Sequence, residues 1–301
     1  MGRRSLSLVR YEPKYLAIRE LHSKHDYPVE TLCAILELNR SSYYKWLRGD
    51  HGAQETKDGE LIDGICVLYR ESNGIFGYRR MQLNLVRRFR LHANRKRVYR
   101  VMRAIGLKSV IRRKRPGYVR TTPEIVAENV LKREFTADQL NEKWLTDVTE
   151  FKYGDGRKLY LSAILDLKDK SIVSWSIGSS NNTSLVFETF DAAVQKYPDA
   201  GPLFHSDRGF QYTGRQFRAK LNARGMTQSM SRVGCCIDNG PMEAFWGTLK
   251  AEMYYLRKFQ DRERLERAIE DYIRFYNNGR FQEKLGGLAP LEYRALLLGT
   301  T

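Results

Sequence analysis

The sequence has little cysteine and no long apolar run. Its four cysteines, Cys33, Cys66, Cys235 and Cys236, show no C-x-x-C spacing, which excludes a zinc ribbon and gives no sign of a disulfide framework. No apolar stretch approaches the roughly 18 residues of a membrane-spanning helix, and no signal-peptide core follows the basic N-terminus. We therefore expect an intracellular protein with reduced thiols and no membrane contact.

Acidic residues are scarce in the first part of the chain. Residues 1–133 carry 29 Lys and Arg against 13 Asp and Glu, whereas residues 134–301 carry 23 against 22. Such an excess is expected of a nucleic-acid-binding region joined to a more neutral body, because neutralised phosphates release counterions. A solvated basic surface that only aids solubility is the alternative. A chain of 301 residues is long enough for two or three domains.

Two short helices separated by a tight turn are predicted within residues 1–50. Pro28 suits the first turn of one helix, and Ser41 suits the N-cap of the next. This pattern is typical of a helix-turn-helix, whose second helix can enter the major groove of DNA. Packing in a helical core is the alternative for its aromatic residues. The candidate DNA contacts on the second helix are Tyr43, Tyr44 and Lys45.

A second helical DNA-binding domain is predicted over residues 57–110. Periodic apolar residues mark helices over residues 61–68, 78–89 and 94–105, the last with Asn94 as its cap. A salt-bridged surface helix would interleave acids among its bases, and no acid occurs between Arg79 and Arg103. Phosphate contact is therefore favoured over a solvated basic face. The candidate contacts are Arg79, Arg80, Lys96 and Arg97.

Residues 111–134 are predicted to be a basic linker. This segment is too charged and too broken by Pro116 and Gly117 for a core element, so it could follow a DNA backbone. A plain flexible tether is the alternative. Its candidate phosphate contacts are Arg112, Arg113, Lys114 and Arg115.

Residues 135–261 are expected to form a mixed α/β domain, followed by a C-terminal helical extension over residues 262–301. Three antiparallel strands in succession are predicted near residues 144–151, 159–165 and 173–177. Strands and helices then alternate, with a short strand at residues 203–206 and a helix from Thr213 to Arg224. A hairpin sheet extended by parallel strands, with helices on its faces, is a mixed α/β architecture.

Three acids stand where this arrangement would bring them together. Asp147 lies inside the first strand, Asp207 directly follows the fourth, and Glu243 lies in the first turn of a later helix. If the first and fourth strands are neighbours, the two aspartates lie side by side and the helix places Glu243 across from them. Mg²⁺ is usually held by one or two carboxylates together with substrate phosphate. Two such ions about 4 Å apart can assist an in-line phosphoryl displacement.

Electrostatics supports a metal at these acids. Three carboxylates without a counter-charge would repel one another and raise one pKa, so a cation is their natural partner. Each acid also has a structural alternative, because Asp207 could initiate a turn, Glu243 could complement a helix dipole and Asp147 could pair with a base. Lys250, about 10 Å beyond Glu243 on the same helix face, could reach a phosphate beside the metal. Asp238 is expected to cap this helix together with Asn239.

Several motifs resemble the integrase core of bacterial insertion-sequence transposases. The resemblance is strongest to the second open reading frame product of the insertion-sequence-three family. The resemblance covers roughly residues 25 to 297. Its upstream motifs lie at residues 77–80 and 94–98. Those of the core are Trp144 to Thr149, His205 to Tyr212, Ser229 to Ser231, Asp238-Asn239 and Glu243 to Glu252, followed by Tyr276 to Arg280 and Leu285 to Tyr293.

The resemblance implies an RNase H-like fold of the retroviral-integrase type, preceded by all-α helix-turn-helix DNA-binding domains. It implies that Asp147, Asp207 and Glu243 form a catalytic triad that binds Mg²⁺, with Mn²⁺ as a possible substitute. The implied reaction is cleavage at the ends of an insertion sequence followed by strand transfer from a 3′-hydroxyl. Gln282 departs from the family pattern, since many relatives have His there.

The resemblance also implies partners. These are DNA, as terminal inverted repeats and as target, further copies of the chain on that DNA, and a product of an upstream reading frame, all within the bacterial cytosol or nucleoid. Two other classes stay open on the sequence alone. A non-enzymatic DNA-binding regulator would need only the N-terminal half, and an RNase H-like nuclease would use the same acids to hydrolyse without joining.

Overall fold

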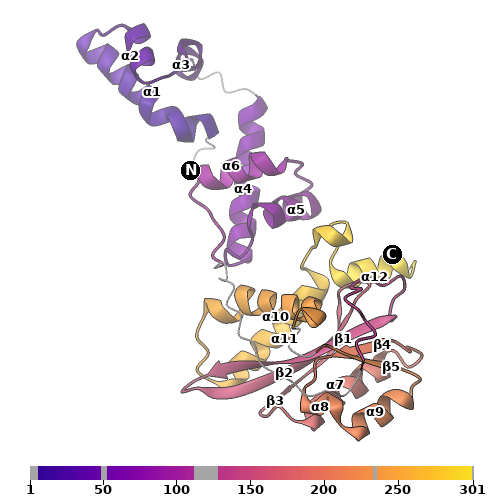
Figure 1. Cartoon of the computed structure of the whole chain (residues 1–301). Coiled ribbons are helices and arrows are strands. Elements are labelled where there is room, and N and C mark those ends of the chain that lie inside the picture. Colours follow the sequence, from indigo (N-terminus) through magenta and orange to yellow (C-terminus); the bar gives the residue numbers. More distant parts are fainter. Residues whose placement is uncertain (1–5, 49–52, 112–127, 233–235, 300–301) are drawn as a thin grey trace. The chain divides into compact units, whose positions relative to one another are not determined.

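A computed structural model describes residues 6–48, 53–111, 128–232 and 236–299 of the chain (Figure 1). The chain divides into two compact units, residues 1–110 and residues 111–301. Within the described ranges, no helix combines the length and the hydropathy needed to span a lipid bilayer.

The first unit begins with three helices, α1 (Leu6–His25), α2 (Val29–Ile35) and α3 (Arg40–Leu47). Tyr15, Ile18, Leu32, Cys33 and Tyr43 are buried together between them. The N-cap of α3 is Asn39 and not Ser41, because the Asn39 side chain accepts a hydrogen bond from the Ser41 amide at 2.9 Å. The predicted pair of short helices with a tight turn is confirmed, with its cap two residues earlier.

The remaining helices of this unit are α4 (Ala53–Glu71), α5 (Tyr78–Phe89) and α6 (Arg95–Ala104). They match the three predicted helices, and Asn94 caps α6 by accepting from the Arg97 amide at 2.8 Å. The helix predicted over residues 61–68 is longer than expected, since α4 begins at Ala53 and ends at Glu71. Gly64 permits α4 to approach α5, since a Cβ there would lie 3.0 Å from a Leu85 methyl group.

The second unit contains a five-stranded sheet of order β3-β2-β1-β4-β5. Its strands are β1 (Lys143–Tyr153), β2 (Arg157–Asp166), β3 (Ile172–Gly178), β4 (Leu203–Ser206) and β5 (Thr227–Met230). β1, β2 and β3 are antiparallel, while β4 runs parallel to both β1 and β5. The predicted hairpin sheet with parallel strands added is confirmed, and so is the adjacency of the first and fourth strands.

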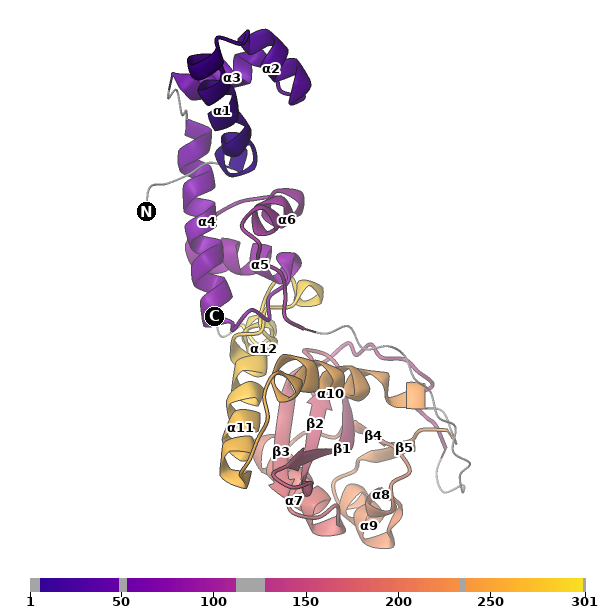
Figure 2. The ribbon, with the colours of Figure 1, turned by 90° about the vertical axis from the view of Figure 1, so that its left-hand side faces the viewer.

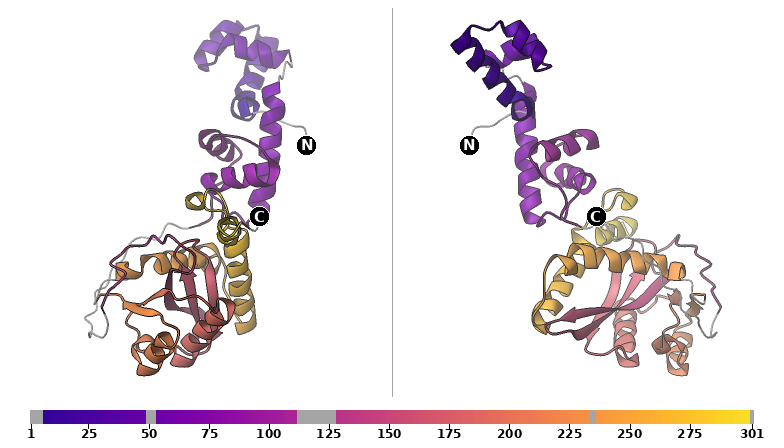
Figure 3. Two further views of the ribbon diagram at one scale, coloured as in Figure 1. Left: turned by 90° about the vertical axis from the view of Figure 1, so that its right-hand side faces the viewer. Right: turned by 60° about the vertical axis from the view of Figure 1, so that its left-hand side comes forward.

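Helices cover both faces of this sheet, as Figures 2 and 3 show. On one face lie α7 (Thr183–Lys196), α8 (Phe210–Thr213) and α9 (Arg215–Asn222), whose apolar residues pack with Trp144 and Phe204. On the other lie α10 (Gly240–Glu252) and α11 (Arg262–Asn278), which pack with Leu145 and Phe151. The helix predicted from Thr213 to Arg224 is confirmed as α9, which is two residues shorter at each end, because Gly214 adopts an extended conformation and separates it from α8.

The segment after residue 261 packs in the hydrophobic core of the second unit. Leu265, Ile269 and Ile273 of α11 are buried in the same cluster as β1 and β2. The Asn277 side chain accepts from the Ile172 amide and donates to the Ile172 carbonyl, both at 2.9 Å, so it takes the place of a strand partner at the β3 edge. The chain ends with α12 (Pro290–Leu297).

A buried ionic network fixes α12 to the turn between β2 and β3. Arg294 donates to Asp166 at 2.6 Å and to Asp169, and all three side chains are almost fully buried. The Arg294 guanidinium also lies over the Tyr197 ring, 4.7 Å from its centroid. Backbone amides of Asn141 and Lys168 donate to Asp166 at 2.8 Å. The two carboxylates therefore share one buried cation, and backbone amides supply further hydrogen bonds, which is the condition for ions to be tolerated there.

We predict that Arg294→Met destabilises the second unit by about 3–5 kcal/mol, because it leaves two buried carboxylates without their counter-charge. Urea unfolding followed by tryptophan fluorescence measures this, since Trp144, Trp175 and Trp246 belong to this unit. Arg267→Ala is the control; its ion pair with Glu263 is exposed, and the expected change is below about 1 kcal/mol. A loss no larger than in the control would show that the network adds nothing net.

Candidate active site

The sheet brings Asp147 and Asp207 to the same level on adjacent strands. β1 and β4 run parallel with Leu145 opposite His205, and each aspartate stands two residues further along its chain. Asp147 lies inside β1, and Asp207 directly follows β4. Because side chains alternate along a strand, Asp147 projects to the same face as Leu145, which is the face covered by α10.

The environment of Asp147 disfavours the ionised form of its carboxyl group. Burial, the nearby charge of Asp207 and the charge of Glu243 raise its pKa to about 7. Two hydrogen bonds act in the other direction, since Asp147 accepts from the Val148 amide at 2.8 Å and from the Trp246 indole at 3.0 Å. The raised pKa expected of clustered carboxylates is thus found at the acid in the centre of the group.

Asp207 is oriented by the turn that follows it. Its carboxylate accepts from the Gly209 amide at 2.9 Å, and burial raises its pKa as well. Gly209 is required at this turn, because a Cβ there would lie 2.7 Å from the Gln211 amide oxygen and 3.0 Å from Asp207 itself. Half-buried Asp207 is therefore presented in one fixed direction.

Glu243 is exposed in the first turn of α10, and two contacts place that helix beside β1. The Asn239 side chain donates to the Thr146 carbonyl at 3.0 Å, one residue before Asp147. Trp246, one turn after Glu243, donates to Asp147 itself. The influence of Glu243 on the pKa of Asp147 agrees with this placement.

The expected helix cap at Asp238 and Asn239 is wrong. Asn239 occupies the N-cap position of α10 without a side-chain cap bond, because its amide group binds β1 instead. Asp238 is fully buried and pairs with Arg133 at 2.6 Å and Arg232 at 2.9 Å, which hold its pKa well below the ordinary value. Arg133 is 105 residues away in the chain, so only the folded structure reveals this partner.

A buried polar network behind Asp207 was not foreseen. His205 lies between the hydroxyl groups of Ser229, at 2.9 Å, and Ser231, at 3.2 Å, and burial lowers its pKa to about 4. The Ser229 hydroxyl also accepts from the amides of Val130 and Leu131. The parallel pairing of β4 with β5 places His205 opposite Ser229, so the network depends on strand adjacency that the sequence does not show. His205 is therefore a neutral structural residue.

The motif residues Glu252 and Arg280 also have a structural role. Arg280 donates twice to Glu252, at 2.9 and 3.1 Å, and Tyr272 donates to the same carboxylate at 2.9 Å. Both charged side chains are largely buried. The pair joins the last turn of α10 to the chain after α11, so it fixes the end of α10 opposite to Glu243.

The predicted DNA contacts fall into three groups. Tyr43 is 1% exposed in the core of the first three helices, so its prediction as a DNA contact is wrong. Arg112, Arg113, Lys114 and Arg115 lie outside the described residues. The others reach the surface to different degrees: Tyr44, Lys45, Arg79 and Lys96 are exposed, and Arg80, Arg97 and Lys250 are half-buried. Lys250 lies over the Phe151 ring, 5.3 Å from its centroid.

The donor set suits a hard divalent cation shared with a substrate. Across the described ranges, no three His, Cys, Asp or Glu side chains are gathered closely enough to hold an ion by themselves. Two adjacent carboxylates, with substrate phosphate and water as the other ligands, are the arrangement that Mg²⁺ commonly uses. The half-buried pair of Asp147 and Asp207 fits this arrangement, and their raised pKa values show that a counter-charge would be favourable.

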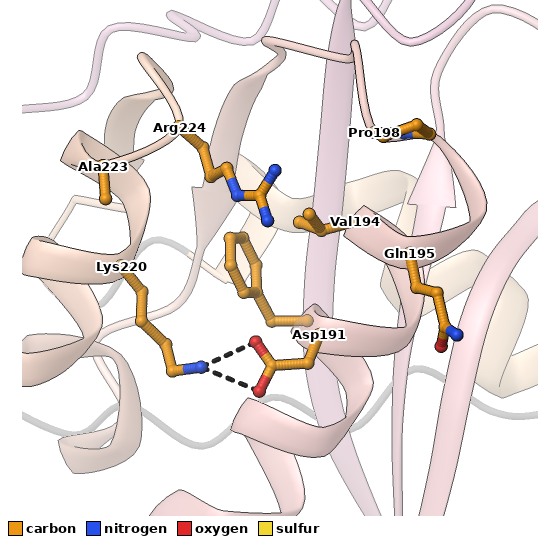
Figure 4. Close-up of a pocket in the computed structure, with 8 residues that line it drawn as sticks. Asp191, Val194, Gln195, Pro198, Lys220, Ala223 and Arg224 are labelled. Carbon is orange, nitrogen blue, oxygen red and sulfur yellow. Dashed lines mark hydrogen bonds and ion pairs between the residues drawn. The ribbon is translucent and has the colours of Figure 1, made fainter.

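A pocket elsewhere in the second unit has a different set of polar residues. It measures about 590 Å³ and lies between α7 and α9, on the sheet face opposite to α10 (Figure 4). Lys220 and Asp191 form an ion pair at 2.6 Å on one side of it, and the Arg224 side chain extends toward its centre. None of the three acids lines it, so the candidate active site is the group of acids at β1, β4 and α10.

Comparison with known proteins finds similar domains and a similar solved structure. Two models of the integrase core domain match residues 137–236 and 243–298, and a model of an HTH-like domain matches residues 56–115. The chain is 20% identical to the HTLV-2 integrase catalytic core domain solved with magnesium, with a TM-score of 0.41 over 52% of this chain and 97% of that one.

Two bacterial proteins match over almost their whole length. The InsK protein of insertion sequence element IS150 from Escherichia coli K12, named as a transposase, is 40% identical over 89% of this chain and 94% of its own. The transposase InsF of insertion sequence IS3A from the same organism is 29% identical over 93% of this chain and 98% of its own. This chain therefore belongs to the IS3 family of insertion-sequence transposases, whose catalytic part is an integrase core domain.

Proposed function

We propose that this transposase cleaves DNA at the ends of an insertion sequence and joins the released 3′-hydroxyl to target DNA, using Mg²⁺ held by Asp147, Asp207 and Glu243. The observation that carries the proposal is the placement of Asp147 and Asp207 at one level of two parallel strands, where burial and the neighbouring charge raise the pKa of Asp147 to about 7. Two half-buried carboxylates on adjacent strands destabilise the folded protein unless a cation neutralises them.

The two chemical steps share one geometry. In cleavage, a water oxygen attacks the phosphorus at the element end, the bond from phosphorus to the 3′-oxygen breaks, and that oxygen leaves as a 3′-hydroxyl. In joining, the same 3′-oxygen loses its proton to solvent and attacks a target phosphorus, and the displaced target 3′-oxygen takes up a proton from solvent. Bound divalent cations would activate the attacking oxygen and stabilise the leaving oxygen. No covalent protein intermediate is needed.

The chain's own residues would position these groups. Trp246 and the Gly209 amide orient the carboxylates of Asp147 and Asp207. Asn239 fixes the start of α10, so that Glu243 approaches the pair from the other side. Lys250, seven residues on and therefore about 10 Å further along the helix, would contact a phosphate next to the reacting one. Binding of DNA ends and target would fall to exposed residues of the first unit, Tyr44, Lys45, Arg79 and Lys96. Arg112 to Arg115, outside the described residues, would add phosphate contacts.

Assembly is part of the proposal. Strand transfer joins two element ends to one target, so we expect several copies of the chain on DNA, and a product of an upstream reading frame as a further partner. Mn²⁺ should replace Mg²⁺, since it accepts the same oxygen ligands.

We predict that Glu243→Gln lowers cleavage and joining of labelled element ends by more than about 100-fold, since even residues that only support metal ligands contribute about 10–100-fold. DNA binding should be retained. Glu263→Gln is the matched control, because Glu263 is also an exposed first-turn glutamate, on α11. Equal activity of the two variants would remove Glu243 from the mechanism.

We predict that Trp246→Phe weakens metal binding, because it removes the indole donor that holds Asp147 while keeping an aromatic ring in place. The half-saturating Mn²⁺ concentration for cleavage should rise by about tenfold, with activity recovering at high Mn²⁺. Trp175→Phe serves as control, since Trp175 lies two strands from Asp147 and no hydrogen bond within the described ranges joins it to the acids. An unchanged metal requirement in Trp246→Phe would show that this hydrogen bond does not position Asp147.

We predict that Asp147→Asn stabilises the metal-free protein more strongly at pH 8 than at pH 5. The folded-state pKa of Asp147 lies near 7, above its unfolded value, so the folded protein binds the extra proton between these values. The aspartate therefore costs stability that appears as the pH rises from about 4 to above 7. Thermal unfolding in EDTA should show a midpoint raised by at least about 2 °C at pH 8. A gain of the same size at both pH values would contradict the assignment.

A further inference from the structure

A basic and aromatic surface lies at the end of α10 that is far from the three acids, and the proposed mechanism does not use it. It is formed by the tip of the β1–β2 hairpin, residues 152–158, and by the connection from α10 to α11, residues 253–260. We call it the hairpin patch. These two segments carry five Lys and Arg against one Asp. The basic residues are Lys152, Arg157, Lys158, Arg257 and Lys258.

Backbone contacts hold the two segments of the hairpin patch together. The Tyr254 hydroxyl donates to the Lys152 carbonyl at 2.8 Å and accepts from the Lys152 amide at 2.9 Å. The Gly154 amide donates to the Phe259 carbonyl at 2.9 Å. Gly154 has φ +51°, and a Cβ there would lie 3.0 Å from the Gln260 carbonyl oxygen. The segments therefore form one preorganised surface, around a pocket of about 290 Å³.

The chemistry displayed by this surface suits nucleic acid. Tyr255 is 64% exposed, a large fraction for an aromatic ring, and all five basic side chains are exposed. Lys158 pairs with Glu150 at 2.9 Å, but no acid in the described ranges forms an ion pair with Lys152, Arg257 or Lys258. Cations without acidic partners neutralise phosphates, and exposed aromatic rings offer stacking surfaces for bases.

The hairpin patch lies in line with the acids along two elements. Successive contacts join β1 to α10 and to the segment that follows it. They are Asp147 with Trp246, Phe151 with Lys250, and the hydrogen bond between residues 152 and 254. Five residues of strand at about 3.3 Å each place Lys152 about 17 Å beyond Asp147. Since a DNA duplex rises about 3.4 Å per base pair, this distance corresponds to about five base pairs.

We propose that the hairpin patch is a second DNA-binding site of the catalytic unit, which holds the backbone and an exposed base about five base pairs from the reacting phosphate. Lys152, Arg257 and Lys258 bind phosphates there, and Tyr255 stacks on a base that is frayed from the duplex. The site rests on the proposed function, because its distance is counted from the acids. A second copy of the chain, bound through an acidic surface, is the competing occupant.

The first test measures DNA affinity of the full chain in EDTA, so that the result does not depend on cleavage. Fluorescence anisotropy with a short fluorescein-labelled duplex is recorded over a range of salt concentrations. Arg257→Ala/Lys258→Ala should bind about tenfold more weakly, and the slope of log affinity against log salt should fall by about two, one for each lost phosphate contact. Lys152→Ala, on the other segment, should lower the slope by about one.

The matched control is Arg264→Ala/Arg267→Ala, which removes the same charge from exposed residues of the neighbouring helix. These arginines already pair with Asp261 and Glu263, at 3.2 and 3.3 Å, so their loss should leave the salt slope unchanged. A slope of wild-type size in Arg257→Ala/Lys258→Ala would overturn the proposal. So would an equal fall in the control, because only net charge would then matter. Thermal unfolding verifies that every variant is folded.

The second test locates the contact. Photoreactive p-benzoylphenylalanine in place of Tyr255 should crosslink to the duplex, whereas the same residue in place of Arg267 should not. Crosslinks from position 255 only to another copy of the chain would assign the hairpin patch to assembly and overturn a DNA site. A wild-type response to these changes, together with an inactive Glu243→Gln, would reject the hairpin patch while leaving the proposed function intact.

Discussion

Repulsion between two carboxylates is the constraint around which the catalytic unit is arranged. Asp147 and Asp207 are half-buried at the same level of adjacent parallel strands, where burial raises the pKa of both and the charge of Asp207 raises that of Asp147 further. A sheet is suited to impose such a placement, because its backbone hydrogen bonds hold the strands whatever the side chains prefer. Each surrounding contact restricts the position of one acid. The indole of Trp246 orients Asp147, and the Gly209 amide orients Asp207. Asn239 fixes the helix that carries Glu243.

The charged residues of the family motifs divide into two physical classes. Burial raises the pKa of Asp147 and Asp207, and the charges of Asp207 and Glu243 raise that of Asp147 further, so these acids form a class that favours an added cation. Asp238 and Glu252 are buried and matched by arginines, Asp238 by Arg133 and Arg232 and Glu252 by Arg280. The second class tethers α10 at both ends, so the helix that presents Glu243 is held by ion pairs that have no part in the chemistry.

Much of this architecture could be predicted from the sequence, and the failures have specific causes. Alternation and apolar runs gave the strands, and the two aspartates at strand positions gave the site, because adjacency of the first and fourth strands follows from a common sheet pattern. The cap of α3 was misassigned because Asn39 and Ser41 both suit an N-cap, and the Asn39 side chain bonds the Ser41 amide. At α10 the Asn239 side chain is instead bound to a tertiary partner, the Thr146 carbonyl. Tyr43 was misplaced because an aromatic residue on a short helix fits a core and a groove equally well.

Both edges of the five-stranded sheet are closed by groups from elsewhere in the chain. Residues 128–131 lie along β5, where the Ser229 hydroxyl and the Met230 amide bind their backbone, and the Asn277 side chain occupies the backbone groups of Ile172 on β3. Exposed strand edges are the usual route by which one sheet extends into another molecule. At Ile172 and Met230 the strand edges leave little room for that route, so the assembly on DNA that we propose would use helices and loops instead.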